Sequence, residues 1–277
     1  MERPNVSIII PTYNSEATLE NCLESIRDQS YVPIETIVVD NMSNDATVKI
    51  AKKSQAKIIQ QKSNPASARN IGIANSTGKY VFFIDSDQVL SRSLVEECVK
   101  KCEEEKARMV RVPEVFVGKD FWSSCSAAWK NRYAKTEEKY GTNQNIMPGK
   151  PRFFLKEQLL GVGMLDPALL WGEDLDLHRR LIKIKTKEVS CRSKLYHYEP
   201  VSVKKILVKN MRYGRSMPTF ERHSKDQVGA LLVRHSLLTL REMVLNSMEK
   251  PSIVLGCIFL LGLKACAMMI GFVMSLG

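Results

Sequence analysis

The chain has 277 residues, 44% of them hydrophobic and 26% charged, with 41 lysines and arginines against 30 aspartates and glutamates. This composition is that of one large globular domain, or of one domain with an appendage, and no internal repeat or low-complexity segment interrupts it. The net charge of +11 favours partners that carry phosphate, whether nucleotide, nucleic acid or anionic lipid. Residues 1–5 lead directly into a predicted core strand, so we expect no secretory signal peptide.

Strand and helix patterns alternate along the first 90 residues. Four strands that alternate with three helices in this order predict an α/β fold, with a parallel sheet that carries helices on its faces. The predicted elements are strand Val6–Ile10, helix Ser15–Gln29 with Ser15 as its N-cap, strand Glu35–Val39, helix Asn44–Ser54, strand Ala56–Gln60, helix Pro65–Ser76 and strand Tyr80–Ile84.

The second part of the chain continues with mixed patterns. We expect helix Ser91–Lys106, strand Met109–Val117, helix Phe121–Tyr140, a loop from Gly141 to Pro151, strand Arg152–Leu155 and helix Asp174–Ile184. The α/β domain is expected to end near Pro200.

The seven cysteines are odd in number and lack C-x-x-C spacing, which favours a reducing cytosol. Cys98 and Cys102 are one helical turn apart and are expected to share a helix face. They could be metal ligands, but the lack of a nearby histidine in the sequence favours buried thiols.

Two aspartates follow the hydrophobic strand Tyr80–Ile84 directly. Because alternate residues of an extended chain point to the same side, Asp85 and Asp87 can both face one hard cation and, through it, a diphosphate. Ligands of parallel sheets gather at the carboxyl ends of the strands, where Pro11–Asn14 and Asp40 also fall. The sequence therefore predicts one site at this edge of the sheet.

Five blocks of sequence occur in an order typical of one known family. With these blocks the chain resembles family 2 glycosyltransferases over about residues 5–200, and the resemblance implies the GT-A nucleotide-sugar-binding fold. The blocks are Val6–Asn14, Ile37–Thr47, Ala66–Gly72, Gly78–Asp87 and Trp171–Leu177.

The resemblance implies how the nucleotide sugar is bound. Tyr13 is expected to cover the base, Asp40 to accept a base N–H, and Arg69 to support the nucleotide or its phosphates, although a structural salt bridge is an alternative for Arg69. In one departure from the family pattern, Met42 stands where relatives usually have glycine or another small residue. The implied nucleotide-sugar site comprises Pro11, Tyr13, Asn14, Asp40, Arg69, Asp85 and Ser86.

The resemblance also implies a divalent cation, Mg²⁺ or Mn²⁺, on the donor diphosphate. Asp87 is its expected ligand, and Asp85 assists near the ribose or the metal. His197 corresponds to a further metal-side or phosphate-side ligand, although a packed histidine between Tyr196 and Tyr198 is the alternative.

The Glu173–Asp174 pair resembles the family's catalytic acidic motif. Asp174 is the expected general base, and inversion at the anomeric carbon is the expected outcome. The metal and Arg179 or Arg180 would stabilise the leaving diphosphate, with Arg180 better matching the family spacing. If the acceptor is a phosphate monoester, Asp174 instead orients it.

The C-terminal part of the chain is expected to meet a membrane. Residues 253–276 carry only one charge, Lys264, and as a helix extend about 36 Å, which matches the thickness of a bilayer's hydrocarbon core. The sequence is compatible with a segment that spans the bilayer, lies at its interface or re-enters it. It is also compatible with a helical hairpin buried within the protein. Val203–Arg215 reads as a basic amphipathic helix at lipid headgroups, or as a solvated face of a core-packed helix, and Val228–Leu245 as a second amphipathic helix.

Together these features predict a GT-A catalytic domain over 1–200, a basic amphipathic helical region over 201–250 and a hydrophobic membrane-associating segment over 251–277, at the cytoplasmic face of the cell membrane. The predicted activity is inverting, metal-dependent transfer of a sugar from a nucleoside-diphosphate sugar, with UDP favoured over GDP, to a polyprenyl phosphate or lipid-linked saccharide. The alternative is an inactive nucleotide-sugar or polyanion-binding module at the membrane. We expect no nucleic-acid partner, because the basic residues cluster beside apolar segments.

Overall fold

A computed structural model of the chain describes residues 3–140, 151–199, 202–224, 228–246 and 250–275. The chain forms two compact units: the first comprises residues 1–114, 150–167 and 173–196, and the second residues 115–149, 168–172 and 197–277. The predicted boundary near Pro200 and the predicted loop Gly141–Pro151, apart from Pro151 itself, lie outside the described residues, and Pro151 begins a strand. The predicted three-part organisation stays a prediction.

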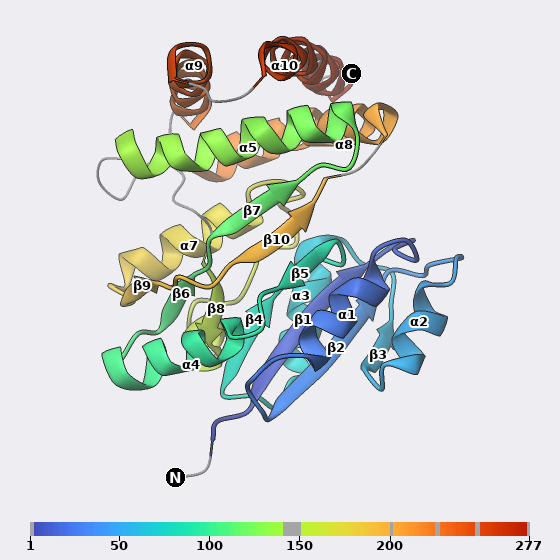
Figure 1. The fold of residues 1–277 in the computed structure, drawn as a ribbon. Coiled ribbons are helices and arrows are strands. Elements are labelled where there is room, and N and C mark those ends of the chain that lie inside the picture. The colour runs from blue at the N-terminus through green and yellow to red at the C-terminus, as the bar shows by residue number, and fades with distance from the viewer. Residues whose placement is uncertain (1–2, 141–150, 200–201, 225–227, 247–249, 276–277) are drawn as a thin grey trace. The chain divides into compact units, whose positions relative to one another are not determined.

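The first unit is built on a seven-stranded sheet with the order β3-β2-β1-β4-β8-β6-β9 (Figure 1). Strand β1 pairs in parallel with β2 and β4, and β2 with β3, whereas β8 runs antiparallel to both β4 and β6. The prediction of a mostly parallel central sheet is therefore confirmed. The strands are β1 (Val6–Thr12), β2 (Ile34–Asp40), β3 (Lys57–Gln60), β4 (Tyr80–Phe83), β6 (Met109–Arg111), β8 (Pro151–Leu155) and β9 (Glu188–Ser190).

Six helices of the first unit flank this sheet among the described residues. They are α1 (Leu19–Arg27), α2 (Thr47–Lys53), α3 (Pro65–Ala74), α4 (Leu94–Glu105), α6 (Lys156–Gly161) and α7 (Glu173–Lys183). The start of α3 is well defined, because Asn64 accepts a hydrogen bond from the Ser67 N–H and Pro65 occupies the first turn. Gly72 lets α3 approach β1 closely, since a Cβ at this position would lie 2.3 Å from Ile9 Cγ2.

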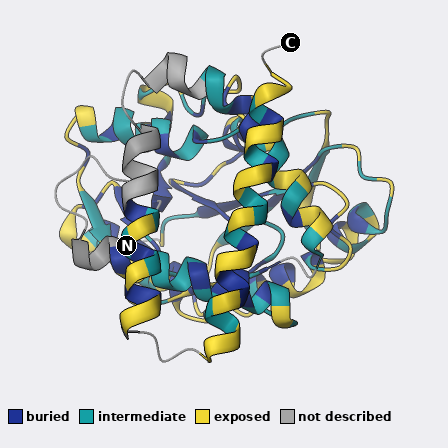
Figure 2. Ribbon diagram, turned by 90° about the horizontal axis from the view of Figure 1, so that it is seen from above, coloured by how far each residue is buried: buried dark blue, intermediate teal, exposed yellow. Residues whose placement is uncertain are grey.

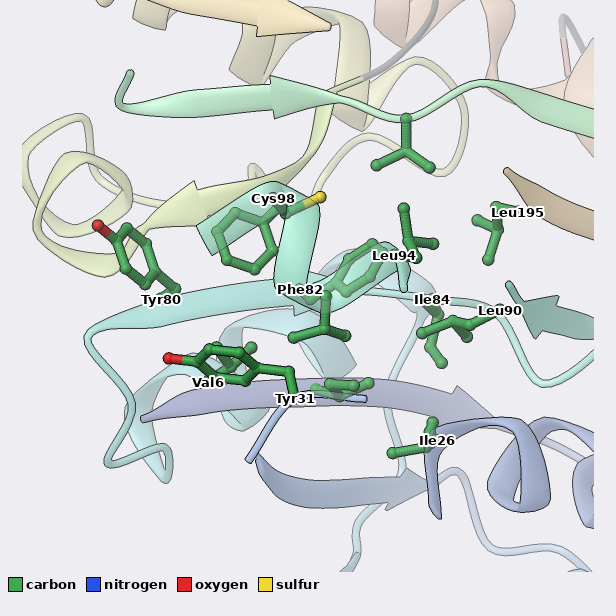
Figure 3. Packing of buried hydrophobic residues seen from close by; sticks show 14 of the residues in the cluster. Val6, Ile26, Tyr31, Tyr80, Phe82, Ile84, Leu90, Leu94, Cys98 and Leu195 are labelled. Atoms are coloured by element: carbon green, nitrogen blue, oxygen red, sulfur yellow. The ribbon is translucent and has the colours of Figure 1, made fainter. Parts of the chain in front are cut away.

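Large apolar side chains fill both faces of the sheet in the first unit. On one face, Val6, Phe82, Ile84, Leu94 and Leu195 belong to one buried cluster (Figure 3). On the other face, Ile9, Val39 and Val81 pack with residues of α3 and α7. A sheet covered on both faces explains why its central strands read as continuous apolar runs rather than alternating ones.

A second sheet has three strands in the order β5-β10-β7, namely β5 (Gln88–Leu90), β10 (Leu195–Tyr198) and β7 (Glu114–Val117). The predicted strand Met109–Val117 is wrong as one element, because it divides into β6 and β7 in different sheets. Pro113 stands between them and, having no N–H, cannot continue a strand ladder as a donor. Helix α1 begins at Leu19, and its N-cap is Thr18 rather than Ser15.

The second unit consists mainly of helices α5 (Phe121–Tyr140), α8 (Val203–Ser224), α9 (Val228–Asn246) and α10 (Pro251–Val273). Its core contains Cys125, Trp129, Met243, Cys257 and Leu260. Helix α10 is long and apolar enough to cross a membrane by length and composition, and most of its residues are not buried within the protein.

The one charge of α10 is held by protein groups of the second unit. Lys264 Nζ donates to Ser126 Oγ at 3.0 Å, and the same hydroxyl donates to Glu199 Oε2 at 2.7 Å. Burial would raise the pKa of Glu199, but the Lys130 ammonium, 2.5 Å away, and the Ser126 hydroxyl lower it. Burial lowers the pKa of Lys264 to about 8, with the charge of Lys130 contributing.

We predict that Lys264 makes stability depend on pH between about 8 and 10.5. Because the unfolded chain binds this proton up to pH 10.5 and the folded chain releases it near 8, the unfolding free energy rises with pH in this window, by up to about 3 kcal/mol. Urea unfolding of the wild type and Lys264→Met in mild detergent would measure this difference. The three tryptophans, all in the second unit, report on its unfolding. Equal pH slopes in the two proteins would contradict the prediction.

Candidate functional site

The carboxyl ends of β1, β2 and β4 meet at one edge of the seven-stranded sheet. Thr12 pairs with Asp40 across β1 and β2, and Ile9 pairs with Phe83 across β1 and β4. In this register Ile84 and Asp85, the two residues that follow β4, lie beside the last residues of β1. The hydroxyl of Ser86 donates to the hydroxyl of Ser15 at 2.9 Å, so the loops after β1 and β4 touch. Open α/β sheets bind ligands at this edge, beyond the carboxyl ends of their strands.

The loop after β1 exposes one aromatic ring and holds its backbone in place. The side chain of Tyr13 is 57% exposed, which leaves its ring available to cover a planar ligand. Asn14 adopts a positive φ of 48°, and its N–H donates to Ser43 Oγ at 2.8 Å. Met42, in the loop after β2, has a φ of 56°, a left-handed conformation that glycine adopts without strain.

Asp40 is fully buried, and neighbouring groups donate hydrogen bonds to both of its carboxylate oxygens. Its Oδ1 accepts from the hydroxyls of Thr12 and Ser43 at 2.9 and 2.5 Å, and its Oδ2 from the Ser43 N–H at 2.9 Å. Gln60 Nε2 is 3.5 Å from the same oxygen. Asp40 thus ties the loops after β1 and β2 together, and its predicted contact with a base stays a prediction that requires one of these bonds to exchange.

Arg69 joins the two acidic motifs of the first unit. Its Nη2 donates to Asp85 Oδ1 at 2.9 Å, and its Nη1 donates to Glu173 Oε1 at 2.8 Å. The guanidinium is buried, and its Nε has no hydrogen-bond partner among the described residues. Burial would lower the pKa of Arg69, but the charges of Asp85 and Glu173 outweigh it and raise that pKa, so the group stays charged. The structure therefore contains the salt bridges that were the alternative prediction for Arg69.

A second buried arginine, Arg152 on β8, reaches the other oxygen of Asp85. Its Nη1 and Nη2 each lie 3.4 Å from Asp85 Oδ2, and its Nε donates to Glu114 Oε1 at 2.5 Å. The burial of Arg152 would lower its pKa, but the charges of Glu114 and Asp85 raise it. Asp85 is thus held between two cations, with Arg69 on one oxygen and Arg152 on the other.

The loop after β4 carries a concentration of negative charge. Cys22 Sγ lies 3.7 Å from the carbonyl oxygen of Asp85, and burial raises the pKa of this thiol. The charges of Asp87 and then Asp85 raise the same pKa further. Both carboxylates therefore lie near enough to Cys22 for their charges to act on its thiol.

The described residues contain no cluster of three or more His, Cys, Asp or Glu side chains able to hold a metal ion. In proteins, Mg²⁺ is commonly bound by one or two carboxylates together with substrate phosphates. His197 lies in the second unit, where its ring packs 5.1 Å from that of Phe116, and its role as a metal ligand stays a prediction.

Glu173 and Asp174 begin helix α7. Asp174 Oδ1 accepts a hydrogen bond from the Leu175 N–H at 2.8 Å, and carboxylates in a first helical turn are stabilised by the helix dipole. The charge of Asp174 acts on both Arg69 and Arg152. Through Arg69, the predicted catalytic pair is thereby brought together with Asp85.

Arg180, on α7, binds the loop that precedes this helix. Its Nη1 donates to the Val162 carbonyl at 2.5 Å, its Nη2 to the Met164 carbonyl at 2.6 Å, and its Nε to Asp176 at 2.9 Å. These bonds hold the loop, so the predicted contact of Arg180 with a leaving diphosphate stays a prediction.

Three residues of the group around Asp85 were not predicted from the sequence, namely Arg152, Glu114 and Gln88. The side chain of Gln88 accepts a hydrogen bond from the Asp85 N–H at 2.8 Å and so fixes the turn. A single arginine inside the apolar strand Pro151–Leu155 was the available signal, because a charge in a fully buried strand requires a buried partner.

Comparison with known proteins gives consistent results. The model of the family "Glycosyl transferase family 2" matches residues 7–159. Glycosyltransferase GlyA of Streptococcus pneumoniae is 38% identical over 108 residues, or 37% of this chain and 16% of that protein. Putative glycosyltransferase EpsH of Bacillus subtilis is 35% identical over 111 residues, or 38% of this chain and 32% of that protein. The matches thus span less than half of the length of these relatives.

Solved structures share the fold at low sequence identity. Mannosyltransferase PcManGT from Pyrobaculum calidifontis, in complex with GDP-Man and Mn²⁺, aligns with a TM-score of 0.63 and 17% identity over 99% of this chain and 88% of that one. S. aureus TarS 1-349, in complex with UDP-GlcNAc, aligns with a TM-score of 0.56 and 16% identity over 95% of this chain and 81% of that one. The fold is the GT-A fold, and the chain belongs to glycosyl transferase family 2.

Proposed function

We propose that the chain transfers a sugar from a nucleoside-diphosphate sugar to an acceptor hydroxyl or phosphate, with inversion at the anomeric carbon. One observation carries the proposal: Arg69 binds both Asp85, after β4, and Glu173, at the start of α7. A single buried cation thus joins the expected donor-binding and catalytic motifs. The complexes of PcManGT with GDP-Man and of TarS with UDP-GlcNAc support a nucleotide-sugar donor.

In the proposed reaction, Asp174 takes the proton of the acceptor hydroxyl while that oxygen attacks the anomeric carbon. The bond from this carbon to the diphosphate oxygen breaks, and its electron pair leaves with the nucleoside diphosphate. Arg69 holds Glu173 beside Asp174 and so orients the start of α7. If the acceptor is a phosphate monoester, its oxygen is already ionised and Asp174 serves to orient it.

We assign Asp87 as the carboxylate that would hold Mg²⁺ or Mn²⁺, because both oxygens of Asp85 face arginines. When bound, such a cation neutralises charge on the diphosphate. Asp85 is then a positioning residue for the turn that carries Asp87. The Mn²⁺ complex of PcManGT supports the use of a divalent cation.

The proposed acceptor is a polyprenyl phosphate or a lipid-linked saccharide at the cytoplasmic face of the membrane. The long apolar helix α10 supports this choice. An inactive module that binds nucleotide sugars is the competing proposal, and it predicts donor binding without turnover.

We predict that Asp174→Asn and Asp87→Asn each lower turnover at least about 100-fold, since each removes a group that acts on the reacting bonds. Release of UDP or GDP from the corresponding sugar donors, with Mn²⁺ or Mg²⁺ and with or without polyprenyl phosphate, measures this effect. Asp28→Asn, a change to an exposed aspartate that ends α1, is the control and should retain full activity. Unchanged turnover in Asp174→Asn would contradict the role of base, and donor binding without turnover by the wild type would favour the inactive module.

We also predict that Arg152→Met destabilises the first unit by about 3 kcal/mol, because it leaves Glu114 and Asp85 as partly buried carboxylates without this cation. Glu114→Gln in the same chain should recover part of the loss, because it removes the charge that has lost its partner. Urea unfolding of the wild type, both single variants and the double variant, followed by circular dichroism, gives the coupling. Strictly additive effects would show that the pair does not interact.

A further inference from the structure

Helix α10 has one face that is exposed along its whole length and carries no charge. Leu255 is 67% exposed, Phe259 57% and Val273 64%, and the exposed positions recur at helical spacing (Figure 2). From residue 255 to residue 274 the exposed positions are Leu255, Ile258, Phe259, Gly262, Ala265, Cys266, Met269, Ile270, Val273 and Met274. A continuous apolar surface of this length is unusual on a protein that meets only water.

The opposite face of α10 is committed to contacts inside the second unit. A Cβ at Gly271 would lie 2.0 Å from the carbonyl oxygen of Met211, and one at Gly214 would lie 2.0 Å from that of Met268. The backbones of α8 and α10 therefore touch, and the two pairs show that the helices run antiparallel. On α5, Ser126 receives the hydrogen bond of Lys264.

Helix α8 places a row of cations beside the apolar face. Among the exposed residues on the described part of α8, only Val208 is apolar, and the others are all basic. They are Lys204, Lys205, Lys209, Arg212 and Arg215. Arg215 Nη2 lies 3.3 Å from the sulfur of Met274, so the cationic row adjoins the exposed face of α10.

We propose that α8 and α10 together bind the surface of an anionic lipid bilayer, with α10 lying in the plane of the interface rather than crossing it. In this placement the exposed residues of α10 enter the acyl boundary and the cations of α8 meet lipid phosphates. A crossing α10 would draw the adjoining cations of α8 into hydrocarbon. The proposal is independent of the proposed transfer reaction, because it can be tested without a sugar donor or acceptor.

Flotation with lipid vesicles tests the binding. The full chain should float with vesicles that contain phosphatidylglycerol, and Phe259→Glu/Ile270→Glu should lower the bound fraction at least tenfold. Lys209→Gln/Arg212→Gln/Arg215→Gln should lower binding to these vesicles at least fivefold without affecting the weaker binding to phosphatidylcholine vesicles. Ile184→Glu, at an equally exposed apolar residue of the first unit, is the matched control and should bind as the wild type.

Depth measurements distinguish the two placements. Cys266 is exposed and the other six cysteines are buried, so a fluorescent label can be attached to Cys266 selectively, or to Leu255→Cys and Val273→Cys with Cys266→Ser. Quenching by lipids that carry nitroxides at known depths should place all three labels at the same shallow depth. A gradient of depth from 255 to 273 would overturn the proposal in favour of a span. Absence of flotation, or a dimer whose formation shields the three labels without lipid, would overturn it in favour of a protein partner.

Discussion

The candidate site depends on a buried cation between two carboxylates. Asp85 and Glu173 lie far apart in the sequence, and each would repel the other if brought together in a dry environment. Arg69 removes this repulsion by bonding to both, at 2.9 and 2.8 Å. Removal of one member of such a group costs about 3–5 kcal/mol, because it leaves an uncompensated charge. The arrangement of the site is thus coupled to the stability of the first unit.

Close packing places that cation. Gly72 is one turn after Arg69 on α3, and without a side chain it lets the helix rest on Ile9 of the central strand β1. The guanidinium is thereby carried to the sheet edge where β4 ends. From β8, Arg152 approaches the same aspartate on its other oxygen. With Asp85 held on two sides, the next aspartate along the turn, Asp87, is the one assigned to a cation that arrives with its substrate.

In the second unit, the neighbouring helix α8 restricts how the apolar helix α10 can meet a membrane. Insertion of a lysine or arginine at the centre of a membrane helix costs about 2.5–3.5 kcal/mol, so the cations of α8 oppose any burial of that helix in hydrocarbon. Because α8 touches α10 backbone to backbone, the two helices share one environment. The interface of a lipid bilayer suits both helices, since lipid phosphates can pair with Arg212 and Arg215 while acyl chains contact Phe259 and Ile270.

Sequence alone determined the fold class and the parallel strands of the sheet, and it predicted a candidate site at their carboxyl ends, because hydrophobic periodicity and local motifs act over a few residues. It also identified Asp85, Asp87 and the Glu173–Asp174 pair as acidic motifs. Only the tertiary structure decided that Arg69 bridges two of them and that Arg152 and Glu114 join the group. A lone arginine in an apolar strand indicates a buried charge, but it does not indicate which distant segment supplies the partner. The two faces of α10 were likewise decided by packing: residues 253–276 are apolar all round, so their periodicity could not distinguish the side that contacts protein from the side left exposed.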